Sequence, residues 1–505
     1  MRLDRKAARI IFPRLGSNMP PPIPVEADFD RFRRMQEAYG FGGLVLFHGD
    51  LRTTPARLAT LQQESDHPIL VASDIERGAG QQLAGATLFP HARAFERLGA
   101  DAETAVETFG AITASEARAA GIHIVFGPVA DVNRDPRNPI IGTRAFGSDT
   151  EKAASLVRAY IRGCRRGGLL ATAKHFPGHG NTHADSHAEL PVVVDAEEVL
   201  VAHDLAPFRA AIAEGVELIM TAHVAYPALD ASGTPATVSR PILHDLLRGR
   251  LGFQGAVVTD SLIMGAVRDR YATEAERAAA LLQAGVDIIL DPLDPPAAVR
   301  GVVEAVERGL VPEERLDDAI RRVEALWTAR PAAGAPSDSA DAHRAFSAEV
   351  ARSALHSRRL TDEALRTGPD TLWIVLNPFA RGTDRPAPYL ASRLAEEAGS
   401  SWMEIGRDDD ASVYETALLR ARDAGAVVVA AIVKPAAWHA FGLPEPMHAL
   451  ATRIFASRPA VLAVLGSPQV MDTFPDAGVQ VCSFSDVPAS VDAIAEHILR
   501  VYLPR

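Results

Sequence analysis

Eight short apolar runs, most of them followed by a longer helical stretch, recur through the first 330 residues. This alternation limits the possible folds more than any other feature of the sequence. Runs that are apolar throughout are typical of parallel strands buried on both faces. Eight strand–helix units predict a (β/α)8 barrel, with an open, doubly wound sheet as the alternative. The runs are residues 10–12, 42–47, 68–74, 123–129, 168–176, 217–224, 256–260 and 286–291.

A second α/β pattern follows a change in composition. Residues 328–342 are rich in Ala, Pro, Ser and Asp, which is typical of a linker. We therefore predict a barrel domain over residues 1–330, a linker over 331–345 and a C-terminal α/β sandwich domain over 346–505. No G-x-G-x-x-G motif or P-loop follows a strand of the second domain, and we expect no cofactor. Its predicted strands are residues 371–376, 425–433, 459–466 and 479–484.

The charge and apolar pattern of the chain argue against two classes of partner. The chain has 505 residues and a net charge of −12, with no basic block, whereas nucleic-acid binding depends on Lys and Arg contacts to phosphate. No run approaches the roughly 20 apolar residues of a membrane span, and the apolar stretch near the N-terminus is too short for a signal peptide. Two distant cysteines, Cys164 and Cys482, indicate a reducing compartment. We expect a cytoplasmic monomer or homodimer that contacts neither nucleic acid nor membrane.

The segment KHFPGHGNTHADSH, residues 174–187, carries four histidines at four-residue spacing. On a helix they would form one stripe and suggest a metal site, but Pro177, Gly178 and Gly180 disfavour a helix strongly. The segment instead reads as a strand that ends in a loop, and loops at the carboxyl ends of barrel strands build active sites. We therefore predict no metal site. The four histidines are His175, His179, His183 and His187.

Asp185 and His187 are two residues apart in this loop, so an extended backbone would point both side chains the same way. A carboxylate beside a histidine fixes its tautomer and raises its pKa, which suits a general acid/base. The alternative is an aspartate that caps its own backbone beside a solvated histidine.

Several motifs in the barrel region resemble glycoside hydrolase family 3, in its β-N-acetylhexosaminidase branch. The resemblance extends through most of residues 1–330, and it is weaker in the second domain. It rests on KHFPGHG (174–180) with DSH (185–187), IIGTRAFGSD (140–149), MTAHVAYPALD (220–230) with PATVS (235–239), VVTDSLIMGA (257–266) and AGVDIILDP (284–292).

The resemblance implies a retaining, exo-acting enzyme that hydrolyses terminal β-linked sugars, N-acetylglucosamine first among them. Asp260 would be the nucleophile, and His187, held by Asp185, would replace the second carboxylate of the usual pair as acid/base. The residues that would bind sugar hydroxyls are Lys174, His175, Arg144 and Asp74. The partner would be a carbohydrate: an oligosaccharide, a muropeptide or a glycoside. From the residues alone, Asp260 could also be a helix N-cap, Lys174 an ion-pair residue and Arg144 a partner of a mainly structural Asp131.

The sequence departs from this branch at DIERGAGQQ, residues 74–82. Ala79 and Gln82 stand at two positions that are usually arginine, and Arg77 stands where a glycine is expected, so Arg77 is a further candidate sugar-binding residue. Three alternatives stay open. The first is a β-glucosidase-like member with Glu445 as the acid. The second is a glycoside phosphorylase, since a histidine base carries no charge to repel phosphate. The third is a sugar-binding protein without catalysis.

Overall fold

The computed structural model describes residues 1–182, 190–268, 270–329, 339–360, 370–379, 390, 393, 401–436, 439 and 441–502. Its contacts divide the chain into two compact units. The first unit consists of residues 1–88, 101–141 and 145–343, and the second of residues 89–100, 142–144 and 344–505. Residues 340–345, which composition placed in the linker, belong to helix α13 (Ala340–Ala354). The apolar-run pattern gave no sign that two short segments of the barrel region make their contacts in the second unit.

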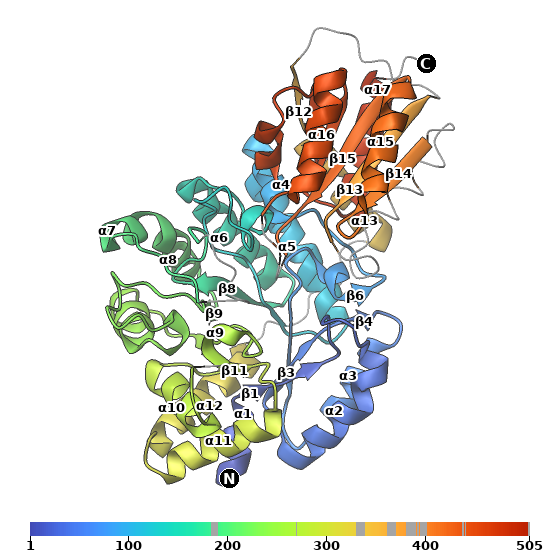
Figure 1. The fold of residues 1–505 in the computed structure, drawn as a ribbon. Helices are drawn as coiled ribbons and strands as arrows, with labels where there is room; N and C mark the ends of the chain where they lie inside the picture. Colours follow the sequence, from blue (N-terminus) through green and yellow to red (C-terminus); the bar gives the residue numbers. More distant parts are fainter. Residues whose placement is uncertain are drawn as a thin grey trace. The chain divides into compact units, whose positions relative to one another are not determined.

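The first unit is a closed barrel of parallel strands, so the prediction of a (β/α)8 barrel is confirmed and the open sheet is excluded. A sheet with strand order β10-β9-β8-β7-β5-β3-β2 is closed by pairing of β11 with β1 and by a bridge between Val258 and Ile288. Every one of the eight predicted runs contributes a strand within the described residues (Figure 1). The strands are β1 (Ile11–Phe12) continuing as β2 (Arg14–Leu15), β3 (Gly43–Leu46), β5 (Leu70–Ser73), β7 (Ile124–Val125), β8 (Leu170–Phe176), β9 (Leu218–Thr221), β10 (Ala256–Val258) and β11 (Ile289–Leu290).

Helices surround these strands, and glycine allows two of them to pack unusually closely. A Cβ atom on Gly163 of α6 would lie 2.2 Å from the Glu107 carbonyl oxygen of α5, so only glycine permits this approach. The larger helices are α1 (Leu3–Arg9), α2 (Val25–Tyr39), α3 (Thr54–Glu64), α5 (Ala102–Ala119), α6 (Thr150–Arg166), α8 (Leu205–Ala213), η6 (Pro241–Arg250), α10 (Glu274–Ala284), α11 (Pro295–Glu307) and α12 (Glu313–Ala329). Shorter elements are β4 (Gly49–Asp50), η1 (Ala79–Gln81), β6 (Leu83–Ala84), α7 (Glu197–Val199), η4 (Leu200–Asp204), η5 (Ala236–Val238) and α9 (Gly265–Arg268).

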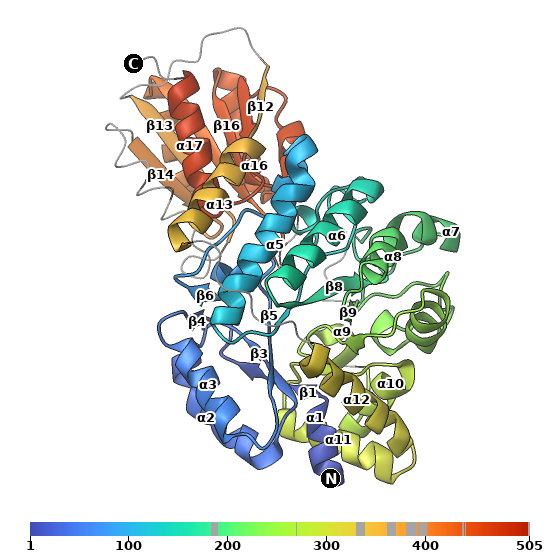
Figure 2. The same ribbon diagram turned by 180° about the vertical axis from the view of Figure 1, so that it is seen from behind.

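The second unit is a sheet with helices on both faces (Figure 2). Helices α15 (Ala411–Asp423) and α16 (Glu445–Ser457) share one apolar core with the sheet, and α17 (Pro488–Tyr502) shares the other. The strand order is β12 (His356–Arg359), β17 (Val479–Cys482), β16 (Val461–Gly466), β15 (Ala426–Val433), β13 (Thr371–Asn377) and β14 (Ser401–Gly406), with only β12 antiparallel to its neighbour. The four predicted strands are present. The sequence did not reveal β12 and β14, because edge strands are partly exposed and read HSRR and SWMEIG rather than apolar.

Two short segments from the barrel region make their contacts within the second unit. Helix α4 (Ala92–Glu96) follows His91, whose Nδ1 lies 2.7 Å from Ser485 Oγ. The turn η3 (Gly142–Arg144) abuts Pro435, since a Cβ atom on Gly142 would lie 2.8 Å from the proline Cγ. Remaining elements of this region are η2 (Gly99–Asp101) and η7 (Pro468–Thr473).

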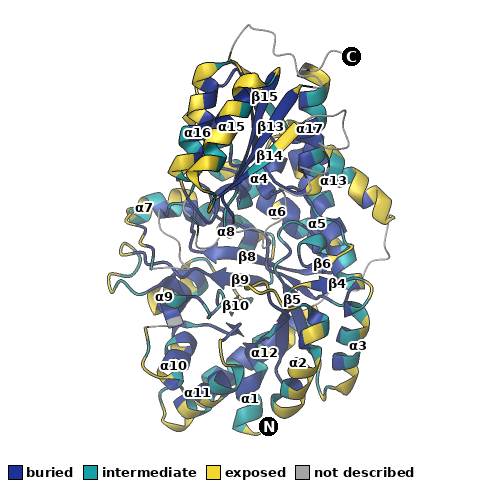
Figure 3. Ribbon diagram, turned by 45° about the vertical axis from the view of Figure 1, so that its right-hand side comes forward, coloured by how far each residue is buried: buried dark blue, intermediate teal, exposed yellow. Residues whose placement is uncertain are grey.

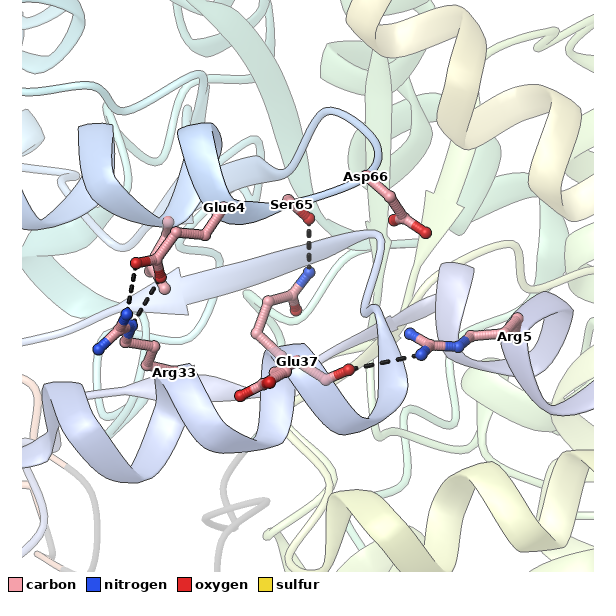
Figure 4. Close-up of a pocket in the computed structure, with 8 residues that line it drawn as sticks. Arg5, Arg33, Glu37, Glu64, Ser65 and Asp66 are labelled. Carbon is pink, nitrogen blue, oxygen red and sulfur yellow. Dashed lines mark hydrogen bonds and ion pairs between the residues drawn. The ribbon is translucent and has the colours of Figure 1, made fainter.

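The strands of the barrel are buried along nearly their whole length (Figure 3). A pocket of about 460 Å³ lies instead between α1 and the carboxyl-terminal ends of α2 and α3, which lead into the amino-terminal ends of β3 and β5. Its walls are already paired: Arg33 faces Glu64 at 2.5 Å, and Arg5 donates to the Glu37 carbonyl oxygen (Figure 4). Because active sites of such barrels form at the carboxyl ends of the strands, this pocket lies at the opposite end.

The chain after β8 is anchored by a buried charge cluster. One nitrogen of Arg134, Nη1, donates to Asp195 and to Asp204, at 2.7 Å in each case, and Asn181 donates to the same oxygen of Asp195. Asp204 also contacts Gly178, where a Cβ atom would lie 2.7 Å from the aspartate Cβ. Burial raises the pKa of Asp204 to about 7, although Arg134 acts to lower it. Residues on both sides of segment 183–189 are therefore tied to one arginine.

The raised pKa of Asp204 predicts a specific dependence of stability on pH. In the unfolded chain this carboxyl group loses its proton near 3.8, and in the folded chain near 7. Between these values the folded state holds one more proton, so this group lowers the free energy of unfolding by about 1.4 kcal/mol per pH unit as pH rises. Asp204→Asn removes this slope. Urea unfolding between about pH 4 and pH 7 should show the variant gaining stability relative to the wild type as pH rises. Equal slopes in the two proteins, with the exposed Asp101→Asn as control, would contradict the assignment.

Candidate active site

Lys174 is held by two carboxylates at the carboxyl end of β8. Its Nζ lies 2.7 Å from Asp74 Oδ1 and 2.5 Å from Glu76 Oε1, and its side chain is only 3% exposed. Asp74 follows β5 directly and keeps about a third of its side-chain surface accessible. The predicted residues Lys174 and Asp74 are therefore brought together, and the ion-pair reading of Lys174 is also correct. A free oxygen of Asp74 beside a fixed ammonium group suits the recognition of a hydroxyl group.

His175, the next residue of β8, pairs with Asp131 after β7. Its Nδ1 lies 2.7 Å from Asp131 Oδ2, and its backbone N–H also donates to this carboxylate. The backbone N–H of His179 donates to Asp131 Oδ1 at 2.6 Å. Burial acts to raise the pKa of Asp131, but the charges and hydrogen bonds of His175 and His179 outweigh it and lower that pKa. Asp131 is fully buried, so it orients His175 and the loop rather than contacting a ligand.

The loop after β8 is built around a position where only glycine fits. A Cβ atom on Gly180 would lie 1.7 Å from the Val132 carbonyl oxygen. The Gly180 carbonyl accepts hydrogen bonds from the backbone N–H groups of Arg134 and Asp135. His179 is also used structurally, because its Nδ1 lies 2.9 Å from the Thr182 hydroxyl. His175 in β8 and His179 in the following turn are thus not on a helix, as the sequence predicted for this part of the segment.

Asp260 lies just beyond the carboxyl end of β10 and is partly exposed. Its Oδ1 accepts a hydrogen bond of 2.7 Å from the Ser261 backbone N–H, which leaves the second oxygen available. Burial acts to raise the pKa of Asp260, but the positive charges of His175, His223 and Lys174 overcome it and lower that pKa to about 2. This carboxylate is therefore ionised throughout the physiological range. An accessible, ionised carboxylate on the rim of a barrel can act as a nucleophile.

His223 is the third residue, with His175 and Lys174, whose charge lowers the pKa of Asp260. It is buried, with Nδ1 2.7 Å from the Thr237 hydroxyl and Nε2 3.3 Å from the Ser261 carbonyl oxygen. Thr237 is fixed in turn by Thr221 at the end of β9. His223 and Thr237 both lie in motifs of the family resemblance, MTAHVAYPALD and PATVS, but the sequence alone indicates a role for neither. The available signal was a histidine at the carboxyl-terminal end of the predicted run 217–224, where rim residues lie.

The two positions that lack arginine are occupied by buried residues. Gln82 is 5% exposed, and its Nε2 donates to the Asp74 carbonyl oxygen at 3.3 Å. Its Oε1 accepts from Asn18 Nδ2 and from the His48 backbone N–H. Ala79 is fully buried. Gln82 therefore supports the backbone of Asp74, and Arg77, which is half-buried, remains the arginine of this segment.

Four predicted site residues lie outside the described residues or in the second unit. Asp185 and His187 lie outside the described residues, so their predicted acid/base role stays a prediction. Arg144 belongs to the second unit through its turn with Gly142. Glu445 is exposed at the first position of α16 in the same unit. The sequence analysis did not predict Glu76, Arg14, Ser261 or Asp291, which the structure shows near the predicted residues.

Among the described residues, no group of three or more His, Cys, Asp or Glu side chains is placed to hold a metal ion. No helix in the described part of the chain is both long and apolar enough to cross a bilayer.

Comparisons with known proteins agree with this geometry. The β-hexosaminidase of Methylococcus capsulatus is 39% identical over 272 residues, which cover 53% of this chain and 79% of that protein. The β-N-acetylglucosaminidase/β-glucosidase of Cellulomonas fimi is 33% identical over 333 residues, which cover 62% of this chain and 58% of that protein.

Solved structures match both units. The family 3 β-N-acetylglucosaminidase from Paenibacillus sp. str. FPU-7 has a TM-score of 0.86 and 29% identity, covering 100% of this chain and 97% of that one. The β-glucoside phosphorylase BglX, at 22% identity and a TM-score of 0.85 over 100% and 93% of the two chains, shares the fold. Residues 3–326, well over half of the chain, match the glycosyl hydrolase family 3 N-terminal domain. The chain therefore belongs to glycosyl hydrolase family 3 and is a glycoside hydrolase.

Proposed function

We propose that this protein is a retaining, exo-acting β-glycosidase that releases terminal β-linked N-acetylglucosamine. The observation that carries the proposal is Asp260: an accessible carboxylate at the end of β10, kept ionised by Lys174, His175 and His223. Relatives named β-hexosaminidase and a structural neighbour described as a β-N-acetylglucosaminidase support the choice of sugar.

The reaction has two steps. Asp260 attacks the anomeric carbon, and the glycosidic oxygen leaves with a proton supplied by His187, so a covalent glycosyl-enzyme forms. His187 then takes a proton from water, which attacks the same carbon and releases Asp260 and the sugar with its original configuration. Asp185 supports the cationic form of His187 in the first step. The dyad takes the part of the second carboxylate of most retaining enzymes.

The lysine and carboxylates at the ends of β5 and β8 supply the sugar contacts in this proposal. Asp74 and Lys174 bind hydroxyl groups at the far end of the terminal sugar, and Glu76 keeps the lysine in place. His175, oriented by Asp131, contacts a neighbouring hydroxyl group. Arg77 and Arg144 are further proposed contacts. A site that fixes the terminal sugar from its far end suits exo-acting cleavage.

Replacing the nucleophile tests the mechanism directly. Asp260→Ala should lower kcat/KM for an aryl β-N-acetylglucosaminide by at least about three orders of magnitude, because no covalent intermediate can form. Added azide should restore turnover of a dinitrophenyl substrate and give the α-glycosyl azide, since the small anion fills the space of the lost carboxylate. NMR identifies the anomer. A folded variant with near-normal hydrolysis, or an azide product of β-configuration, would contradict the assignment.

Lys174→Met should shift the acidic limb of the pH profile of kcat/KM. Asp260 must be ionised to attack, and in the wild type its pKa is about 2, so the limb lies at very low pH. Removing one of the charges that lower this pKa raises it, and the limb moves to higher pH. KM should also rise, because a hydroxyl contact is lost.

Lys6→Met is a matched control for this variant. Lys6 is likewise held by two carboxylates, Glu313 and Asp317, but it lies on α1, away from the strand carboxyl ends. It should leave both KM and the pH profile unchanged. An unshifted limb in Lys174→Met would mean that this lysine does not act on Asp260.

A panel of aryl β-glycosides tests the choice of sugar. N-acetylglucosaminide, glucoside and xyloside substrates should be compared with and without phosphate. We expect the N-acetylglucosaminide to give the highest kcat/KM, with free sugar as the product. A higher value for the glucoside would place the enzyme with β-glucosidases, and sugar 1-phosphate above the hydrolysis background would make it a phosphorylase.

A further inference from the structure

Ser261, the residue after Asp260, is held at three separate atoms. Its backbone N–H donates to Asp260 Oδ1 at 2.7 Å, its hydroxyl donates to Asp291 Oδ2 at 2.6 Å, and its carbonyl oxygen lies 3.3 Å from His223 Nε2. The residue whose N–H contacts Asp260 is therefore held at its side chain and at both of its backbone polar groups. A backbone N–H can orient a carboxylate only as firmly as its own peptide is held.

Asp291 is the buried centre of this arrangement. Its side chain is 2% exposed, and its backbone has a φ of 53°, a left-handed conformation that a residue with a short polar side chain tolerates. Its backbone N–H donates to the Phe12 carbonyl oxygen in β1, at the seam that closes the barrel. Burial raises the pKa of Asp291, and the hydrogen bonds from Arg14 and Ser261 act to lower it. The carboxylate thus needs both partners to remain charged in a buried place.

Arg14, at the start of β2, binds Asp291 through two hydrogen bonds. Nε donates to Oδ1 at 2.6 Å and Nη2 donates to Oδ2 at 2.5 Å, a fork geometry that fixes the plane of the carboxylate. The remaining nitrogen, Nη1, donates to Ser17 Oγ at 3.2 Å. Contacts therefore run without a gap from Arg14 in β2, through Asp291 after β11, to Ser261 after β10.

We propose that Arg14, Asp291 and Ser261 form a positioning relay that sets the angle at which Asp260 meets the anomeric carbon. None of the three has to touch the sugar. The relay rests on the proposed role of Asp260 as nucleophile. It explains why Arg14, Asp291 and Ser261 are held so firmly next to that residue. A carboxylate bound at one oxygen by a fixed N–H presents its other oxygen in one direction, and small losses of alignment are costly in reactions of this kind.

Two isosteric changes test the relay. Ser261→Ala removes only the hydroxyl group, and Asp291→Asn keeps the shape and tolerates the same backbone conformation while removing the charge. Each should lower kcat for an aryl β-N-acetylglucosaminide by about tenfold to a hundredfold with KM changed less than about twofold, because alignment rather than binding is lost. Ser261→Thr keeps the hydroxyl and should recover most of the rate.

The double variant distinguishes a relay from two independent contacts. If the residues act as a unit, Ser261→Ala combined with Asp291→Asn should lose no more than the worse single variant, whereas independent effects multiply. Thr87→Val is the matched control, since Thr87 also donates a hydroxyl to a carboxylate, Glu116 Oε1 at 2.7 Å, among described residues that do not contact Asp260. Its kcat should equal that of the wild type.

The outcomes separate the relay from the proposed function. An inactive wild type, or an Asp260→Ala variant with normal activity, overturns the proposed function itself. If wild type is active and Asp260→Ala is not, then normal kcat in folded Ser261→Ala and Asp291→Asn overturns the relay alone. Lower thermal stability with normal kcat per folded molecule also overturns it, because it shows a purely structural pair. Losses of kcat that multiply in the double variant would also overturn the relay.

Discussion

Closure of the barrel between β11 and β1 is the constraint on which the rest of the site depends. The pairing of Ile289 with Ile11, together with the bridge between Val258 and Ile288, brings the carboxyl ends of β2, β10 and β11 to one part of the rim. Without this closure, Arg14 and Asp260 would be separated by some 245 residues of chain and by an open sheet edge. Edge strands with unpaired backbone groups are unstable arrangements, so closure is favoured by the sheet itself and the rim follows from it.

The side chains whose charges lower the pKa of Asp260 have partners of their own. Lys174 is held by Asp74 and Glu76, and His175 is held by Asp131. Held by these partners, the side chains act on Asp260 through space: they lower its pKa while it stays partly exposed. In the proposed mechanism, the partner carboxylates therefore serve reactivity as well as stability.

The sequence predicted the barrel well because its strands are buried on both faces and so read as continuous apolar runs. It predicted Asp74, Lys174 and His175 as neighbours only through a family resemblance, since Asp74 and Lys174 are 100 residues apart. What it missed has physical reasons. Strands β12 and β14 are partly exposed and therefore polar. Asp291 and Ser261 both lie in quoted motifs, but no local pattern pairs them, because their contact crosses the barrel seam. The placement of Arg144 in the second unit depends on tertiary contacts that no local spacing reveals.

The structure explains what occupies positions 79 and 82, where the sequence departs from the hexosaminidase branch of the family. A loss of two arginines reads as a loss of ligand contacts, yet Gln82 uses both the nitrogen and the oxygen of its amide group, on Asp74, Asn18 and the backbone of His48. Turning that side chain toward a ligand would leave buried polar groups unpaired, at a cost of about 1–3 kcal/mol each. Gln82 is thus part of the support for Asp74 rather than a weakened sugar contact. In the proposed function, Asp74 and Lys174 bind the far end of the sugar. Arg77, on the same short segment as Asp74 and Glu76, is the arginine proposed to contact the sugar as well.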